Sequence, residues 1–183
     1  MDFILASKSP RRREILKDIG LPFSVVETNA EEEDTEIYSS PLDTVKRLSY
    51  KKAAAVLPFS GEESLIIGAD TIVVIDGNIL GKPKDYEEGR LMLKSLSGKT
   101  HTVYTGMTLI YNSKAGVKEH SSAALADVRI KPLSDSEIKA YLDTGEYADK
   151  AGAYGIQEKG AALVEAVNGD YFAVVGFSVS DLF

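Results

Sequence analysis

The residues near the N-terminus best suited to chemistry are Ser9, Pro10, Arg11 and Arg12. They predict a helix that begins at Pro10 with Ser9 as its N-cap. The first turn of a helix carries unpaired N–H groups and the positive end of the helix dipole, and both favour an anion such as phosphate. Because that dipole disfavours cations, Arg11 and Arg12 would destabilise the turn unless an anion joined them, and guanidinium groups bond phosphate oxygens in pairs. The alternative is that these arginines lie at the start of a surface helix and are simply solvated. Among the three arginines, Arg13 is the one most expected to face the solvent only.

Asp70 is the second candidate. It lies within residues 64–75, an apolar stretch that predicts a strand buried on both faces. A buried carboxylate is costly without a partner or a metal, so its presence indicates a site, and the small residues Gly68 and Ala69 leave room for a ligand. One hypothesis is that ionised Asp70 orients or deprotonates a water molecule. The alternative is an aspartate at a strand end that caps a neighbouring loop.

Other charged and polar residues could complete a site around Asp70. The acidic stretch 31–36 could supply a second ligand for Mg²⁺ or Mn²⁺, which prefer oxygen ligands, although acidic loops are commonly only solvated. Lys52, near the end of a predicted helix, and Lys82, in a Gly-Lys-Pro loop, are candidate phosphate contacts, and each could equally be solvent-exposed. A glycine-rich stretch precedes Gln157, whose amide can both donate and accept hydrogen bonds. This stretch is typical of a loop that faces a ligand.

The apolar pattern and the turn residues predict the elements that must position these side chains. Predicted helices run from Pro10 to just before Gly20, over 41–56 and 86–95, and from the capping box at Ser134 to near Gly145. Predicted strands cover 3–6, 22–27, 64–75, 78–80, 100–111, 117–131, 161–167 and 171–175. Asp76-Gly77 and Asn168-Gly169 predict hairpin turns, and a third turn is expected at Asn112-Ser113. The mixture predicts an α/β fold, with antiparallel hairpins on a mixed sheet, in one domain or in two small lobes that share a sheet.

Composition restricts the function classes. The 183 residues carry a net charge of −7, which argues against a nucleic-acid binder, while local basic clusters suit a compact polyanion held in a pocket. The absence of cysteine excludes disulfides, thiolate nucleophiles and Cys-based zinc sites, and fits an intracellular location. Two histidines make a His-rich metal site or a Ser-His-Asp triad improbable. The sequence also predicts neither a membrane span nor a secretory signal.

Several stretches together resemble the Maf family of nucleotide pyrophosphatases, and the match runs along nearly the whole chain. They are residues 5–12, 68–71, 81–83, 96–98, 149–157, 169–171 and 174–176. The first stretch and residues 149–157 are long and specific. The resemblance implies one α/β domain over residues 1–183, made of two lobes, with a mixed sheet flanked by helices and a central cleft, as in inosine triphosphatases. Family members commonly continue into a C-terminal helix, whereas this sequence ends at Phe183.

The resemblance also implies an activity: hydrolysis of a nucleoside triphosphate to the monophosphate and pyrophosphate, with a divalent metal, Mg²⁺ or Mn²⁺. The loop before Gln157 looks like that of the branch acting on dTTP and UTP, with modified pyrimidine nucleotides as further candidates. A cytoplasmic enzyme is expected, without nucleic-acid or membrane partners, and a homodimer is left open. The alternative function is a nucleotide-binding regulator of cell division or septum formation with little catalysis.

Residue roles follow from the same resemblance. Asp70 would activate water and hold the metal with Glu32. The substrate would be bound by Ser9, Arg11, Arg12, Lys52, Lys82, Thr71 and Gln157. Among these, Arg11, Thr71 and Gln157 would set substrate preference.

Overall fold

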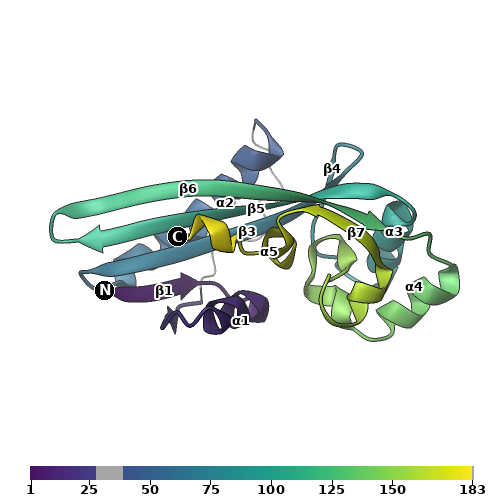
Figure 1. Cartoon of the computed structure of the whole chain (residues 1–183), viewed down its shortest axis with the longest axis horizontal. Helices are drawn as coiled ribbons and strands as arrows, with labels where there is room; N and C mark the ends of the chain where they lie inside the picture. The colour runs from purple at the N-terminus through teal and green to yellow at the C-terminus, as the bar shows by residue number, and fades with distance from the viewer. Residues whose placement is uncertain (28–38, 183) are drawn as a thin grey trace. The chain divides into compact units, whose positions relative to one another are not determined.

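The computed structural model describes residues 1–27 and 39–182 and has an α/β fold (Figure 1). The strands are β1 (Asp2–Ala6), β2 (Ser24–Val25), β3 (Ser64–Ile75), β4 (Asn78–Leu80), β5 (Thr100–Ser113), β6 (Gly116–Ile130) and β7 (Val164–Gly169). The helices are α1 (Pro10–Asp18), α2 (Pro41–Val56), α3 (Tyr86–Leu96), α4 (Asp135–Leu142) and α5 (Tyr171–Val175). Short 3-10 helices are η1 (Leu57–Phe59), η2 (Glu146–Asp149), η3 (Ala151–Ala153), η4 (Glu158–Leu163) and η5 (Val179–Asp181).

The strands form one mixed sheet in the order β2-β1-β3-β5-β6-β7, and β4 pairs with β3. The pairs β1–β2 and β1–β3 are parallel, whereas β3–β4 and β6–β7 are antiparallel. The predicted α/β class with a mixed sheet is therefore confirmed. Within the described residues, none of the helices has both the length and the apolar character needed to cross a membrane.

Local signals located most elements correctly. The helix at Pro10 begins where Ser9 and Pro10 predicted it, and the Ser40 hydroxyl accepts a hydrogen bond from Asp43 N at the start of α2. At the first hairpin, Asp76 (φ 49°) and Gly77 (φ 78°) both adopt the left-handed conformation that a tight two-residue turn requires. The capping box at Ser134 is also present.

Several predicted elements differ from the structure, among them the strand predicted over 161–167, whose first three residues belong to η4. The chain turns between β5 and β6 at 114–115, two residues later than expected, and the predicted strand 22–27 is reduced to β2. Asn168-Gly169 is not a hairpin turn, because both residues pair with β6, opposite Asp127 and Ala126. The expected strand 171–175 is the helix α5. Asp170 precedes this helix: its carboxylate accepts from Phe172 N and its carbonyl accepts from Val174 N.

The described chain divides into two compact units. Unit 1 comprises residues 1–70, 105–124 and 176–183, and unit 2 comprises residues 71–104 and 125–175. Strands β3, β5 and β6 each contribute residues to both units.

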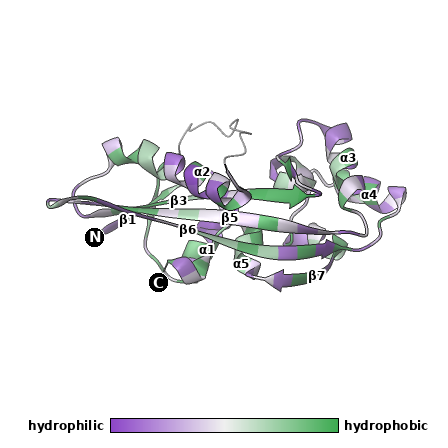
Figure 2. Cartoon of the chain, turned by 90° about the horizontal axis from the view of Figure 1, so that it is seen from above, coloured by the Kyte–Doolittle hydropathy of each residue, from purple (hydrophilic) through white to green (hydrophobic). Residues whose placement is uncertain are grey.

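Unit 1 is built around the parallel pair β1 and β3. Figure 2 shows α2 on one face of these strands and α1 on the other, and α2 carries both hydrophobic and hydrophilic residues. The apolar side of α2 packs on the strands in a cluster of Ile4, Ala6, Ala53, Val56, Ile66 and Ile110. Burial of this face fixes where the polar residues of α2 lie.

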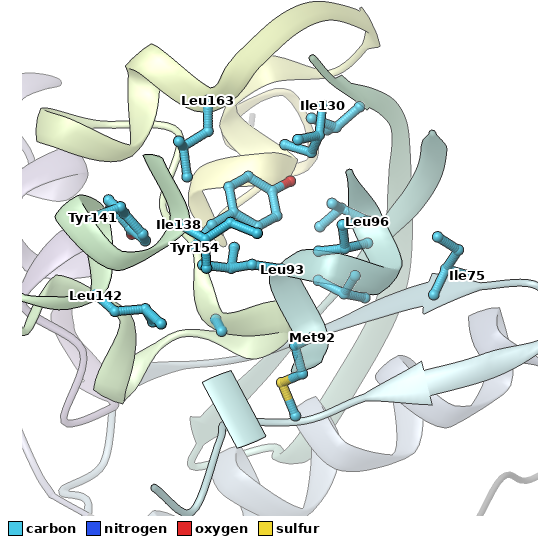
Figure 3. Packing of buried hydrophobic residues seen from close by; sticks show 14 residues of the cluster. Ile75, Met92, Leu93, Leu96, Ile130, Ile138, Tyr141, Leu142, Tyr154 and Leu163 are labelled. Carbon is cyan, nitrogen blue, oxygen red and sulfur yellow. The ribbon is translucent and has the colours of Figure 1, made fainter. Parts of the chain in front are cut away.

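Unit 2 has its own apolar core, formed mainly by α3, α4 and β6. Figure 3 shows the Tyr154 ring among aliphatic side chains of this core, including Leu96, Ile130 and Leu163. The Tyr154 hydroxyl meets Nε2 of buried His101 at 2.7 Å. Burial lowers the pKa of His101 from 6.5 to about 4, against the opposing effect of the Asp127 carboxylate. His101 is therefore a neutral partner that holds Tyr154 in the core.

Candidate functional site

The turn between β1 and α1 is organised by Ser7 and Arg12. The Ser7 hydroxyl accepts from the Ser9 backbone N–H at 3.1 Å and from Arg12 Nη1 at 3.3 Å. Arg12, only 9% exposed, also donates from Nε to the Gly176 carbonyl at 2.7 Å. Arg12 therefore ties the predicted phosphate-binding turn to the C-terminal segment of unit 1. The sequence alone gave no sign of this bond to Gly176 or of the central place of Ser7.

The other arginines of the turn differ in their surroundings. Arg13 pairs through Nη2 with the Glu27 carboxylate at 2.9 Å, but it is half-buried, so it faces the solvent less than expected. Arg11 is half-buried in the first turn of α1. The Ser9 side chain makes no capping hydrogen bond within the described part of the chain. The start of α1 therefore combines backbone N–H groups with arginine side chains, an arrangement suited to an anion.

Asp70 and Lys52 form an ion pair in unit 1, where β3 lies against α2. Their side chains expose only 14% and 12% of their surfaces, respectively. A half-buried carboxylate needs such a partner, because desolvation of an unpaired charge is expensive. The hypothesis that Asp70 is a partnered carboxylate on an apolar strand is consistent with this geometry. Asp70 does not lie at a strand end, because β3 continues to Ile75.

Two glycines bring α2 close enough to form this pair. A Cβ added to Gly68 would lie 2.3 Å from the Ser49 carbonyl oxygen and 2.8 Å from Ala53 N. At Gly106 on β5, a Cβ would lie 2.2 Å from the Val45 carbonyl oxygen. Backbone therefore packs on backbone at both positions, which no larger residue permits. Because side chains alternate along a strand, Asp70 and Gly68 share the face that α2 covers.

The register of β1 and β3 brings the arginine turn and Asp70 to adjacent strands. Ala6, the last residue of β1, lies opposite Gly68 in the parallel ladder. Neighbouring strands are about 4.8 Å apart, so the chain that leaves β1 starts its turn beside the segment of β3 that reaches Asp70. The turn that follows β1 therefore begins beside the segment of β3 that carries Asp70, whereas α1 itself lies on the face of the strands opposite α2.

The remaining predicted substrate residues lie in unit 2. Thr71 is half-buried on β3, Lys82 is exposed in the loop after β4, and Gln157 is half-buried directly before η4. The loop that carries Lys82 is bonded to η3, because Gly152 N donates to the Gly81 carbonyl at 3.0 Å. The structure therefore links the Lys82 loop to the glycine-rich stretch that precedes Gln157.

A divalent metal needs oxygen donors close to the proposed phosphate-binding turn. Asp70 offers a carboxylate, and Mg²⁺ commonly binds through one or two carboxylates together with substrate phosphates and water. No cluster of three or more His, Asp or Glu able to hold a metal by itself occurs within 1–27 and 39–182. The donor set therefore fits a metal that shares its ligands with a bound phosphate. Glu32, predicted as a second ligand, lies outside the described residues.

The comparisons with known proteins identify the family of this chain. A family model described as "Maf-like protein" matches residues 2–183. A protein of Thermoanaerobacter sp. (strain X514) named dTTP/UTP pyrophosphatase is 51% identical over 183 residues, covering 100% of this chain and 94% of the relative. A protein of the same name from Bacillus cytotoxicus is 48% identical over 180 residues, covering 98% and 91%. The solved Ham1 protein of Staphylococcus aureus has a TM-score of 0.47 and 11% identity over 71% of this chain and 72% of that chain, too weak to support a conclusion. On the family model and the two relatives, this chain belongs to the family of Maf-like proteins.

Proposed function

We propose that this chain is a nucleoside triphosphate pyrophosphatase that hydrolyses dTTP and UTP to the monophosphate and pyrophosphate. The observation that carries the proposal is the half-buried Asp70–Lys52 pair, on the strand next to the arginine turn. A carboxylate paired with a cation, on the strand beside a turn that carries arginines, suits water attack on a phosphoanhydride whose charge must be neutralised. The relatives named dTTP/UTP pyrophosphatase, of which this chain covers 94% and 91%, support the choice of substrate.

In the proposed reaction, water attacks the α-phosphorus and the bond from that phosphorus to the bridging oxygen breaks. Pyrophosphate leaves with the bridging oxygen, and the nucleoside monophosphate gains the water oxygen. Asp70 accepts the proton that the water loses. Arg11 and the helix N-terminus, with Ser9, Arg12 and Lys52, bind the phosphate oxygens of the substrate, and Lys82 assists them.

A divalent ion, Mg²⁺ or Mn²⁺, is the proposed cofactor, held by Asp70 and Glu32. When bound, it would neutralise phosphate charge and lower the pKa of a coordinated water. Thr71 and Gln157 are the proposed contacts that select the base, because an amide can match both a donor and an acceptor on a pyrimidine edge. A cytoplasmic location and a homodimer remain predictions.

The alternative, a nucleotide-binding regulator with little catalysis, is not favoured, since the relatives carry the names of pyrophosphatases. It predicts tight binding of UTP without pyrophosphate release when metal is added. A panel of canonical and modified nucleoside triphosphates, assayed for pyrophosphate release with Mg²⁺ or Mn²⁺ and again with a chelator, separates the two functions.

The decisive variant is Asp70→Asn, which keeps the shape of the side chain and removes its ability to take a proton. We expect pyrophosphate release from dTTP and UTP to fall by about 100-fold or more, the contribution typical of a general base. Asp76→Asn is the matched control, because Asp76 is an exposed turn residue at φ 49°, where asparagine is equally suitable. Near wild-type turnover in Asp70→Asn would remove Asp70 from this role.

A further inference from the structure

Unit 2 contains a carboxylate, Glu146, that holds the ends of a loop together. This loop, the Gln157 loop, comprises residues 155–160. Glu146 Oε1 accepts from Gly160 N and Glu146 Oε2 accepts from Lys159 N, both at 3.1 Å. Two consecutive backbone N–H groups thus point at a single carboxylate, an arrangement that binds anions strongly.

The other end of the loop is attached to Glu146 through Tyr141. The Tyr141 hydroxyl accepts from Gly155 N at 3.2 Å and donates to Glu146 Oε1 at 3.3 Å. Burial raises the pKa of this hydroxyl, so it keeps the proton that it donates. The Tyr141 ring belongs to the apolar core of unit 2 (Figure 3), so the loop is anchored to a rigid part of the fold.

The loop ends approach so closely that only glycine fits at position 160. A Cβ on Gly160 would lie 1.9 Å from the Gly155 carbonyl oxygen, and one on Gly155 would lie 2.6 Å from Lys150 Cε. Lys150 in turn donates to the Glu146 carbonyl at 2.6 Å. Beyond Gln157, Glu158 adopts φ 54°, a conformation that non-glycine residues enter only at a cost. The surrounding bonds must therefore hold this strained turn in place.

We propose that Glu146, together with Tyr141, is a positioning residue that gives the enzyme its selectivity for the base by fixing the Gln157 loop. This inference rests on the proposed function, in which the Gln157 amide contacts a pyrimidine. A uracil or thymine ring offers an acceptor at O4, whereas cytosine offers a donor at N4. A loop whose backbone is fixed limits the places that the Gln157 amide can reach, and so limits which edge of the ring it meets; a mobile loop would let the amide meet either ring. Glu146 touches neither the substrate nor the reacting atoms in this account.

The test compares Glu146→Ala, Glu146→Gln and a control, Glu165→Gln, in the full chain. Glu165 lies on β7 and pairs with Arg129 at the surface at 2.8 Å, away from the loop contacts. The first readout is the ratio of kcat/KM for UTP to that for CTP. Loss of Glu146 should lower this ratio about tenfold, mainly by raising the KM for UTP. We expect a change of this size because the site loses oriented hydrogen bonds to the base. Glu146→Gln keeps one acceptor and should recover part of the ratio, whereas Glu165→Gln should leave it unchanged.

The second readout is amide hydrogen exchange at Lys159 and Gly160. Both amides should exchange faster in the Glu146 variants, while amides of α4 such as that of Ile138 keep their protection, which separates local opening from unfolding. Faster exchange with an unchanged UTP-to-CTP ratio would overturn the proposal, and so would unchanged exchange. If the wild-type chain released no pyrophosphate, the proposed function would fail. The ratio of Kd values for UTP and CTP, measured without metal, would then still decide the role of Glu146.

Discussion

Replacing Gly68 by alanine tests whether the close contact of α2 and β3 creates the Asp70 site. The added Cβ would lie 2.3 Å from the Ser49 carbonyl oxygen and 2.8 Å from Ala53 N, and both are backbone atoms that cannot rotate away. An ordinary contact needs more than 3 Å, so α2 must move away from β3 by about 1 Å. Lys52 is on this helix, so the displacement also draws its ammonium group away from Asp70.

The magnitude follows from the cost of overpacking. Forcing an extra methyl group into a packed contact costs about 1–3 kcal/mol of unfolding free energy. In a chain of this size that corresponds to a drop in Tm of roughly 2–12 °C. Pyrophosphate release should fall as well, because a displacement of about 1 Å of a catalytic group can cost about 100-fold in rate.

The assay is thermal unfolding together with pyrophosphate release from UTP. Gly61→Ala is the matched control, since a Cβ there would meet Ser64 Oγ at an ordinary 3.9 Å and Gly61 is exposed. A Gly68→Ala protein with the Tm and turnover of the wild type would refute the reasoning. A large loss of stability without loss of turnover at low temperature would show that the contact does not position Lys52.

Two further changes test other contacts. Arg12→Lys keeps the charge, but an ammonium group cannot reproduce the guanidinium that bonds both Gly176 and Ser7. The free energy of unfolding measured in urea should therefore fall by about 1–3 kcal/mol, and the KM for UTP should rise. Unchanged values would contradict this role of the Arg12 guanidinium. The pKa of His101 is about 4 in the fold against 6.5 in the unfolded chain, so the unfolded chain binds the extra proton between these values. The contribution of neutral His101 to the free energy of unfolding is therefore fully present above pH 6.5. This contribution should fall by roughly 3 kcal/mol as the pH drops to about 4. His101→Gln should flatten this dependence in urea unfolding measured across the pH range, and an equal slope in both proteins would argue against a buried neutral His101.

Much of the fold was predictable because its signals are local. Proline and serine before α1, the Asp76-Gly77 turn and the capping box at Ser134 each act over a few residues, and the structure has all three where expected. The hairpin at Asn168-Gly169 failed because a neighbouring strand outweighed the local preference. Gly169 pairs with Ala126 on β6, and this ladder continues the strand through a dipeptide that usually turns.

The sequence by itself determined the types of chemical group available and their approximate elements: a carboxylate on an apolar strand, arginines at a helix start, and an amide after a glycine-rich loop. It could not determine which partners these groups acquire, since contacts such as Lys52 with Asp70, Arg12 with Gly176 and Glu146 with Gly160 join residues 18, 164 and 14 positions apart. Such contacts depend on strand register and on the close approach of backbones at glycines. Tertiary structure alone decided that Asp70 has a cation beside it, that Arg12 bonds the turn after β1 to the Gly176 carbonyl, and that Glu146 accepts hydrogen bonds from the Gln157 loop.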